Sequence, residues 1–186
     1  SDYEVFFEEL VSPEWLLPLP KEGMFQEPPE PTSDGKYITF PVWPESRYLV
    51  RMASVAPDDA LQIALKIPPT ENVRVHEDLA EVARLIPAEL GVAFVPKVRK
   101  WLDSSYQLLL PEKVAQLAAH FAKSGHVASA LDLLRGLLAV RPDQQSAREE
   151  DDSSFTASIV PVARFHEWEY KRILSEYVPA VAAVAP

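Results

Sequence analysis

The side chains best suited to chemistry are the histidines, of which the chain has four: His76, His120, His126 and His166. His76-Glu77 and His166-Glu167 begin the helical pattern His-Glu-x-x-His, in which two histidines one turn apart hold a zinc ion. Ala80 and Tyr170 stand where the second histidine would have to be. Neither pair therefore predicts a zinc site, and we expect all four histidines on helix surfaces or in turns.

The remaining chemical motifs are also incomplete. His120 and His126 flank a predicted turn at Gly125, but the nearest acidic side chain, Asp132, makes a poor third metal ligand. The chain contains no G-x-S-x-G elbow, P-loop or dinucleotide fingerprint. We predict no catalytic, cofactor-binding or metal-binding residue, and no cofactor. A hydrolase-type enzyme domain that pairs a carboxylate with His76 or His166 stays open as an alternative.

Composition excludes several classes of function. The 186 residues include no cysteine, which removes disulfide scaffolds, thiolate zinc sites and cysteine nucleophiles and is typical of a reducing cytosol. A formal net charge of −10 argues against nucleic-acid binding, and we interpret Lys97, Arg99 and Lys100 as a solvated helix face. No apolar run approaches the ~20 residues that cross a bilayer. We expect a cytoplasmic protein that binds neither nucleic acid nor membrane.

The two ends of the chain suggest a piece of a longer polypeptide. Ser1 opens directly into an apolar pattern, and Pro186 follows a helix-like run. With 47% hydrophobic and 25% charged residues, the length suits one packed domain. We predict a single helical domain over 1–186, excised from a larger intracellular protein of bacterial type.

Proline and glycine define the elements that must position any site. The chain has 18 prolines and 5 glycines, which is about twice the usual share of proline and well below that of glycine. From residue 44 onwards a proline and one or two acids repeatedly precede an amphipathic run, as at Pro57-Asp58-Asp59 and Pro111-Glu112. Both residue types favour the first helical turn. The pattern predicts an all-α fold of short antiparallel helix pairs.

Two segments interrupt this pattern. Residues 26–44 combine a polyproline-like stretch with aromatic residues, and we predict an ordered loop pinned by Tyr37, Phe40 and Trp43. Within it, residues 36–40 alternate like a short strand, but one strand without a partner makes no sheet. Residues 143–154 are polar and rich in acids, which predicts a mobile acidic loop.

The clearest local motif is a helical pair over residues 111–144. Its marker residues are Val114, Leu117, Ala118, Phe121, Gly125, Ala130 and Pro142. The two small residues let the helices approach closely, and the glycine permits the reversal between them. The segment resembles a tetratricopeptide repeat, whose large, small, aromatic, turn and terminal positions match these residues. Because the preceding residues do not repeat the pattern, the chain is similar to an irregular HEAT-type array, which implies an irregular right-handed α-solenoid.

Repeats of this kind bind extended peptides along their first helices. The resemblance implies that Glu112, Ala115, Ala119 and Lys123 lie exposed on that surface, unless it packs on a neighbouring helix. Trp43, framed by prolines, either presents its ring to a partner or attaches the loop to the core. We predict a non-catalytic protein-interaction or scaffolding module that binds a protein, a peptide or flanking domains of the same polypeptide. A purely structural spacer is a further alternative.

Overall fold

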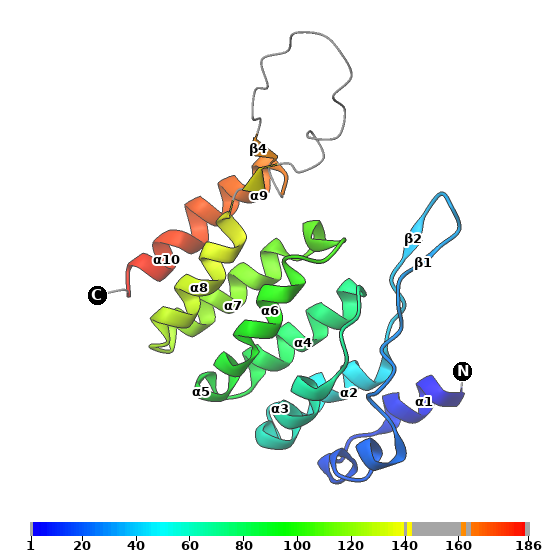
Figure 1. Cartoon of the computed structure of the whole chain (residues 1–186). Helices are drawn as coiled ribbons and strands as arrows, with labels where there is room; N and C mark the ends of the chain where they lie inside the picture. Colours follow the sequence, from blue (N-terminus) through cyan, green and yellow to red (C-terminus); the bar gives the residue numbers. More distant parts are fainter. Residues whose placement is uncertain (1, 140, 143–160, 163–164, 185–186) are drawn as a thin grey trace.

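The fold is mostly helical, as the proline-punctuated sequence predicts (Figure 1). The computed structural model describes residues 2–139, 141–142, 161–162 and 165–184. The predicted acidic loop, 143–154, lies outside these residues. No helix within the described part of the chain is long and apolar enough to cross a bilayer.

The helices follow one another with short connections. The α-helices are α1 (Asp2–Glu9), α2 (Pro44–Met52), α3 (Pro57–Lys66), α4 (Val73–Leu85), α5 (Ala88–Gly91), α6 (Val95–Trp101), α7 (Pro111–Lys123), α8 (Val127–Leu138), α9 (Glu167–Arg172) and α10 (Val178–Ala182). Single turns of 3₁₀ helix form η1 (Pro13–Leu16), η2 (Leu19–Glu22), η3 (Val92–Phe94) and η4 (Gln107–Leu109), and a π-helical turn, η6 (Ile173–Tyr177), joins α9 to α10.

The predicted start signals lie at the helix starts. Pro44, Pro57 and Pro111 each occupy the first turn of their helix, where the missing N–H costs no hydrogen bond. Ser12 caps η1 by accepting the Glu14 backbone N–H at 3.3 Å. These helix starts confirm the prediction, because the local chemistry of proline and capping residues decides them.

The helices stack broadly in chain order and share one hydrophobic core (Figure 1). Helix α2 contacts α1, α3 and α4; α4 in turn contacts α7, and α7 packs on α8 and on the C-terminal segment of η6 and α10. The core runs from Phe7 at one end to Val181 at the other. Helix α6 contacts α4 and α8. It lies beside the connection between α3 and α4 (Figure 1).

The proline-rich loop differs from its prediction in two respects. Residues 38–39 do find a partner, because β2 (Ile38–Thr39) pairs antiparallel with β1 (Thr32–Ser33) around the Gly35 turn. Tyr37 is exposed at the tip of this hairpin and pins nothing to the core. Phe40 meets Tyr106 edge to face at 5.0 Å, so the loop is held at its C-terminal side. A second short pair joins β3 (Arg141–Pro142) to β4 (Pro161–Val162).

The helical pair predicted within 111–144 forms over residues 111–138, as α7 and α8. Helices α7 and α8 pack against each other, and Gly125 between them adopts φ 88°, in the left-handed region. Ala118 and Ala130 are completely buried, as close approach of the two helices requires. Arrangement as a tetratricopeptide unit stays a prediction.

Asn72 ties the proline-rich loop to α4. Its Oδ1 accepts the Arg74 N–H at 3.0 Å and so caps the helix, while Nδ2 donates to the Pro29 and Pro41 carbonyls at 3.0 and 2.8 Å. The side chain is fully buried, so removing it leaves the Pro41 carbonyl and one helical N–H without partners, and leaves the Pro29 carbonyl with only the Thr70 hydroxyl at 3.3 Å.

We expect Asn72→Ala to lower the free energy of unfolding by about 2 kcal/mol, measured by urea denaturation. Ser12→Ala is the matched control, because Ser12 caps an exposed 3₁₀ turn and its side chain makes no bond to another element. We expect a smaller loss of about 0.5 kcal/mol for this variant, at the lower end of the cost of losing a cap. Equal losses in the two variants would contradict the role of Asn72 in holding the loop.

Candidate functional site

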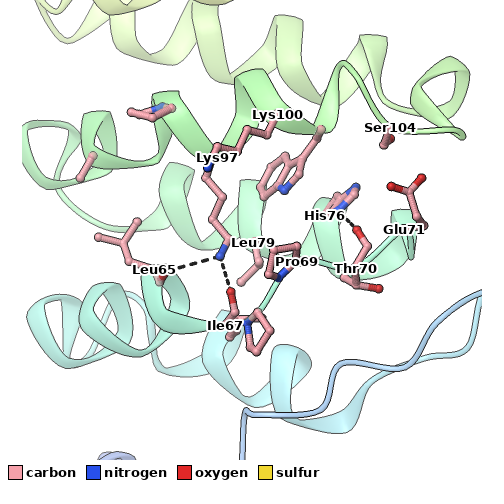
Figure 2. Close-up of a pocket in the computed structure, with 14 residues that line it drawn as sticks. Leu65, Ile67, Pro69, Thr70, Glu71, His76, Leu79, Lys97, Lys100 and Ser104 are labelled. Atoms are coloured by element: carbon pink, nitrogen blue, oxygen red, sulfur yellow. Dashed lines mark hydrogen bonds between the residues drawn. The ribbon is translucent and has the colours of Figure 1, made fainter.

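A cleft suited to a ligand lies between the α3–α4 connection and α6 (Figure 2). It encloses about 410 Å³, within the usual size of small-molecule sites. Leu79 of α4, Pro69 of the connection and Trp101 of α6 supply apolar wall. Six of the fourteen lining residues are polar or charged, and they come from both sides of the cleft, so that polar groups converge on an apolar wall as in a binding pocket.

The sequence builds this cleft through its prolines. Pro68 and Pro69 prevent α3 from continuing beyond Lys66 and keep the chain extended up to the cap at Asn72. The extended connection leaves the Ile67 carbonyl turned toward α6. Pro96 lies in the first turn of α6, so that helix begins beside the connection and presents its next turns to it.

Two lysines form one end of the cleft. Lys97 is half-buried, and its Nζ donates to the Ile67 carbonyl at 2.6 Å and to the Leu65 carbonyl at 3.4 Å (Figure 2). Burial and, after it, the charge of Lys100 lower the pKa of the Lys97 ammonium. Lys100 is exposed and lies one turn further along α6. Neither ammonium forms a salt bridge with a carboxylate of the described residues.

His76 forms the inner wall at the other end. Its side chain is 1% exposed and its ring stacks on the Trp101 indole, with centroids 4.8 Å apart and planes 15° from parallel. Nε2 lies 2.8 Å from the Thr70 carbonyl oxygen, which can only accept, so Nε2 carries the proton. Burial lowers the pKa of His76 to about 4 and keeps the ring neutral. Nδ1 is then a buried acceptor, and it has no partner among the described residues.

Ser104 and Glu71 complete this end of the cleft. Ser104 follows α6, and its buried hydroxyl also lacks a partner within the described structure. The Glu71 carboxylate accepts the Ser105 backbone N–H at 2.7 Å, which joins the two sides of the cleft. Figure 2 shows Ser104, Glu71 and His76 grouped at one end, with Lys97 and Lys100 at the opposite end.

The side chains of the cleft are arranged to bind a ligand. The Nε2 proton of His76 is held by Thr70, and no hydrogen bond joins the His76 ring to the Ser104 hydroxyl, so the pair is not arranged as base and nucleophile. No group of three potential metal ligands occurs in the described residues. The cleft offers positive charge at one end, a hydrogen-bond acceptor at the other and apolar wall between them.

No family model, curated protein or solved structure matches this chain.

The histidines are only partly where the sequence predicts them. The expectation that His76 lies on a helix surface is wrong, because the face of α4 that carries His76 packs under the α3–α4 connection and α6. His120 is half-buried on α7, and burial lowers its pKa. His166 is exposed and caps α9. Its backbone N–H donates to the Glu169 carboxylate at 2.8 Å.

The interpretation of Lys97, Arg99 and Lys100 as a solvated face holds only for Lys100. Lys97 is bonded to the α3–α4 connection, and Arg99 donates to the Asp132 carbonyl at 3.0 Å. The one sequence signal for the cleft is the run from Pro96 to Trp101, in which Lys97 and Lys100 lie one helical turn apart ahead of the tryptophan.

The fold places the predicted partner-binding residues in different environments. The expectation that Ala115 and Ala119 are exposed is wrong, because α7 is covered by neighbouring helices and both side chains are buried. Glu112 is half-buried and binds within the chain, accepting from Tyr177 and Gln116 and pairing with Arg172 at 3.1 Å. Lys123 is exposed at the end of α7.

Trp43 belongs to the core. Its side chain is 4% exposed and meets Phe25 edge to face at 6.3 Å. This burial agrees with the interpretation in which Trp43 attaches the loop to the core, and it leaves no ring surface open to a partner.

The first elements of the chain expose an unusual amount of apolar surface. We define the N-terminal apolar surface by six exposed side chains of α1, η1 and the residues next to them: Tyr3, Val5, Phe6, Val11, Trp15 and Leu17. Phe6 and Trp15 are 42% and 43% exposed, and their rings meet edge to face at 6.4 Å. Helix α1 lies at the end of the helical stack (Figure 1).

Proposed function

We propose that the chain is a non-catalytic protein-interaction or scaffolding module of a larger protein. It is built as an irregular right-handed α-solenoid of short antiparallel helix pairs, in which residues 111–144 form a tetratricopeptide-like unit. The stacking of α2, α4 and α7 in chain order and the tight α7–α8 pair support this architecture. The partner is a protein, a peptide or a flanking domain of the same polypeptide.

The N-terminal apolar surface carries the proposal. In a stack of helices each unit buries its apolar face on the next, and a terminal unit that ends the stack presents a polar outer face. Here the terminal unit presents Phe6 and Trp15, large aromatic side chains that are enriched at the centres of protein interfaces. Phe6 and Trp15 contact each other, and an exposed aromatic pair of this kind favours contact with another protein.

The test is a pair of matched double variants of the chain. Phe6→Ser with Trp15→Ser removes the rings at the N-terminal apolar surface, and Leu108→Ser with Leu109→Ser changes two exposed apolar residues of η4. A protein retained from lysate is identified, purified and titrated against the variants, with thermal melts to verify that each is folded. We expect the aromatic variant to raise Kd at least about tenfold and the η4 variant to leave it unchanged.

Two outcomes would contradict the proposal. The first is that the wild-type chain retains no protein that also binds when purified, which would favour a structural spacer. The second is that both double variants bind with the wild-type Kd, which would place the contact elsewhere on the chain.

A further inference from the structure

We propose that the cleft between the α3–α4 connection and α6 binds a small organic anion with a flat apolar body and a hydrogen-bond donor at the end away from its charge. This site is separate from the N-terminal apolar surface, and the proposal does not depend on the interaction function. Each part of the ligand is inferred from one part of the cleft.

The anionic group is inferred from Lys97 and Lys100. The two ammonium groups line one cleft from successive turns of α6 and have no carboxylate of the described residues to neutralise them. Lys97 uses two of its N–H bonds on backbone carbonyls, which points the side chain across the cleft and leaves one N–H for a ligand. A carboxylate or phosphate placed between them would relieve the repulsion and accept charge-assisted hydrogen bonds.

The flat apolar body is inferred from the middle of the cleft. Trp101 is held by its stack on His76, and Leu79 and Pro69 line the same cleft. Only 6% of Trp101 is exposed, and this part lies in the cleft beside apolar side chains. It favours a planar ligand, because a planar body fits against it with little loss of conformational freedom.

The donor is inferred from His76 and Ser104. Because Thr70 holds the Nε2 proton, Nδ1 can only accept, and it is buried without a partner in the described structure. A buried acceptor without a hydrogen bond is unfavourable, so a hydroxyl or amine that reaches it gains binding energy. The carboxylate of Glu71 lies at this end as well and would repel a second anionic group. The ligand therefore binds with its charge toward the lysines.

Matched small probes test both ends of the ligand. Phloretate carries a carboxylate and a phenolic hydroxyl at opposite ends of a flat body; hydrocinnamate lacks the hydroxyl, and tyramine replaces the carboxylate by an ammonium. AMP offers a phosphate and an amino donor instead, so it distinguishes a phosphate from a carboxylate ligand. Binding is followed by the indole N–H of Trp101 in proton–nitrogen correlation NMR, assigned with Trp101→Phe. We expect saturable shifts with phloretate or AMP at Kd on the order of 1 mM or below, and none with tyramine.

Variants of the full chain test which residues bind the two ends of the ligand. We expect Lys100→Gln to raise the Kd of the bound anion at least about fivefold, since it removes one charge-assisted contact. Ser104→Ala should weaken phloretate at least about threefold and leave hydrocinnamate unchanged. Lys123→Gln, an exposed lysine of α7, is the charge-matched control and should change neither Kd.

Three outcomes would overturn the proposal. One is the absence of a saturable shift with every anionic probe up to about 10 mM, which would mean that water alone satisfies the cleft. Another is equal binding of tyramine and phloretate. The third is an unchanged Kd in Lys100→Gln, whose exposed side chain is not needed for folding.

Discussion

Replacing Gly91 by alanine is expected to lower the free energy of unfolding by about 3 kcal/mol and the melting temperature by about 10 °C. Gly91 is buried at the end of α5, where its backbone touches α4. A Cβ there would lie 2.4 Å from the Ala83 carbonyl oxygen and 3.1 Å from Cε1 of Phe121. The first contact is with helix backbone, so it cannot be relieved by a change of rotamer.

Gly136→Ala is the matched control. Gly136 is also buried in a helix, α8, but the Cβ would meet side-chain atoms and no backbone: Nη1 of Arg99 at 2.5 Å and Cδ1 of the buried Leu102 at 2.9 Å. Arg99 can move toward solvent, and alanine is intrinsically better than glycine in a helix by about 1 kcal/mol. We therefore expect a change of about 1 kcal/mol or less, of either sign, for Gly136→Ala.

Urea denaturation and thermal melts of the two variants check this prediction. A small effect of Gly91→Ala, equal to that of Gly136→Ala, would mean that α5 can move away from α4 without loss of packing. The expected difference between the variants identifies Gly91 as the point where the two helix backbones come closest.

The helices and their starts could be predicted from the sequence, because the signals are local. Pro57 and Pro111 begin helices where the proline-and-acid pattern places them, and Asn72 caps α4 as its residue type suggests. The turn at Gly125 follows from the same local chemistry, since a left-handed residue is needed between two closely packed helices.

Which helix faces pack against one another was harder to predict from the sequence. Ala115 and Ala119 look like an exposed stripe, because small residues are equally suited to solvent and to a close helix contact, and only the helices that pack on α7 decide between the two. Gly91 gives no local sign that it lies against Ala83. The pairing of β1 with β2 was also missed, because Thr32 and Ser33 carry no strand pattern of their own.

The cleft was missed because its residues come from separate parts of the chain. His76, Trp101 and Lys97 are ordinary side chains at helical spacing, and their grouping depends on how α4 and α6 pack around the α3–α4 connection. The sequence interpretation treated histidine as a surface residue, whereas the Thr70 carbonyl and the Trp101 ring give His76 a buried, neutral environment.

That environment makes the protein sensitive to acid. In the unfolded chain a histidine takes up its proton near pH 6.5, whereas burial, the largest cause, lowers the pKa of folded His76 to about 4. Between these values the unfolded state binds more protons, so stability falls as the pH falls. The contribution of neutral His76 is complete above about pH 6.5 and is lost by about pH 4, and its size is about 3 kcal/mol.

Comparison with His76→Gln isolates this contribution, because glutamine can donate to the Thr70 carbonyl but does not titrate. Glu71 and Glu30 favour protonation of His76 and Lys97 opposes it, and all three are unchanged in the variant. The raised pKa values of Glu77 and Asp78, both caused mainly by burial, affect the two proteins alike and cancel in the comparison. The variant starts from a lower stability at neutral pH, since it loses the stack on Trp101.

We therefore expect the free energy of unfolding, measured with urea from about pH 7.5 to pH 4, to fall by about 3 kcal/mol more in the wild type than in His76→Gln. An NMR titration of the His76 ring in the folded protein should show its midpoint near pH 4. Parallel curves for the two proteins, or a midpoint near pH 6.5, would mean that His76 is open to solvent. Its Nδ1 would then be hydrated in the free protein, and the acceptor end of the cleft would lose its basis.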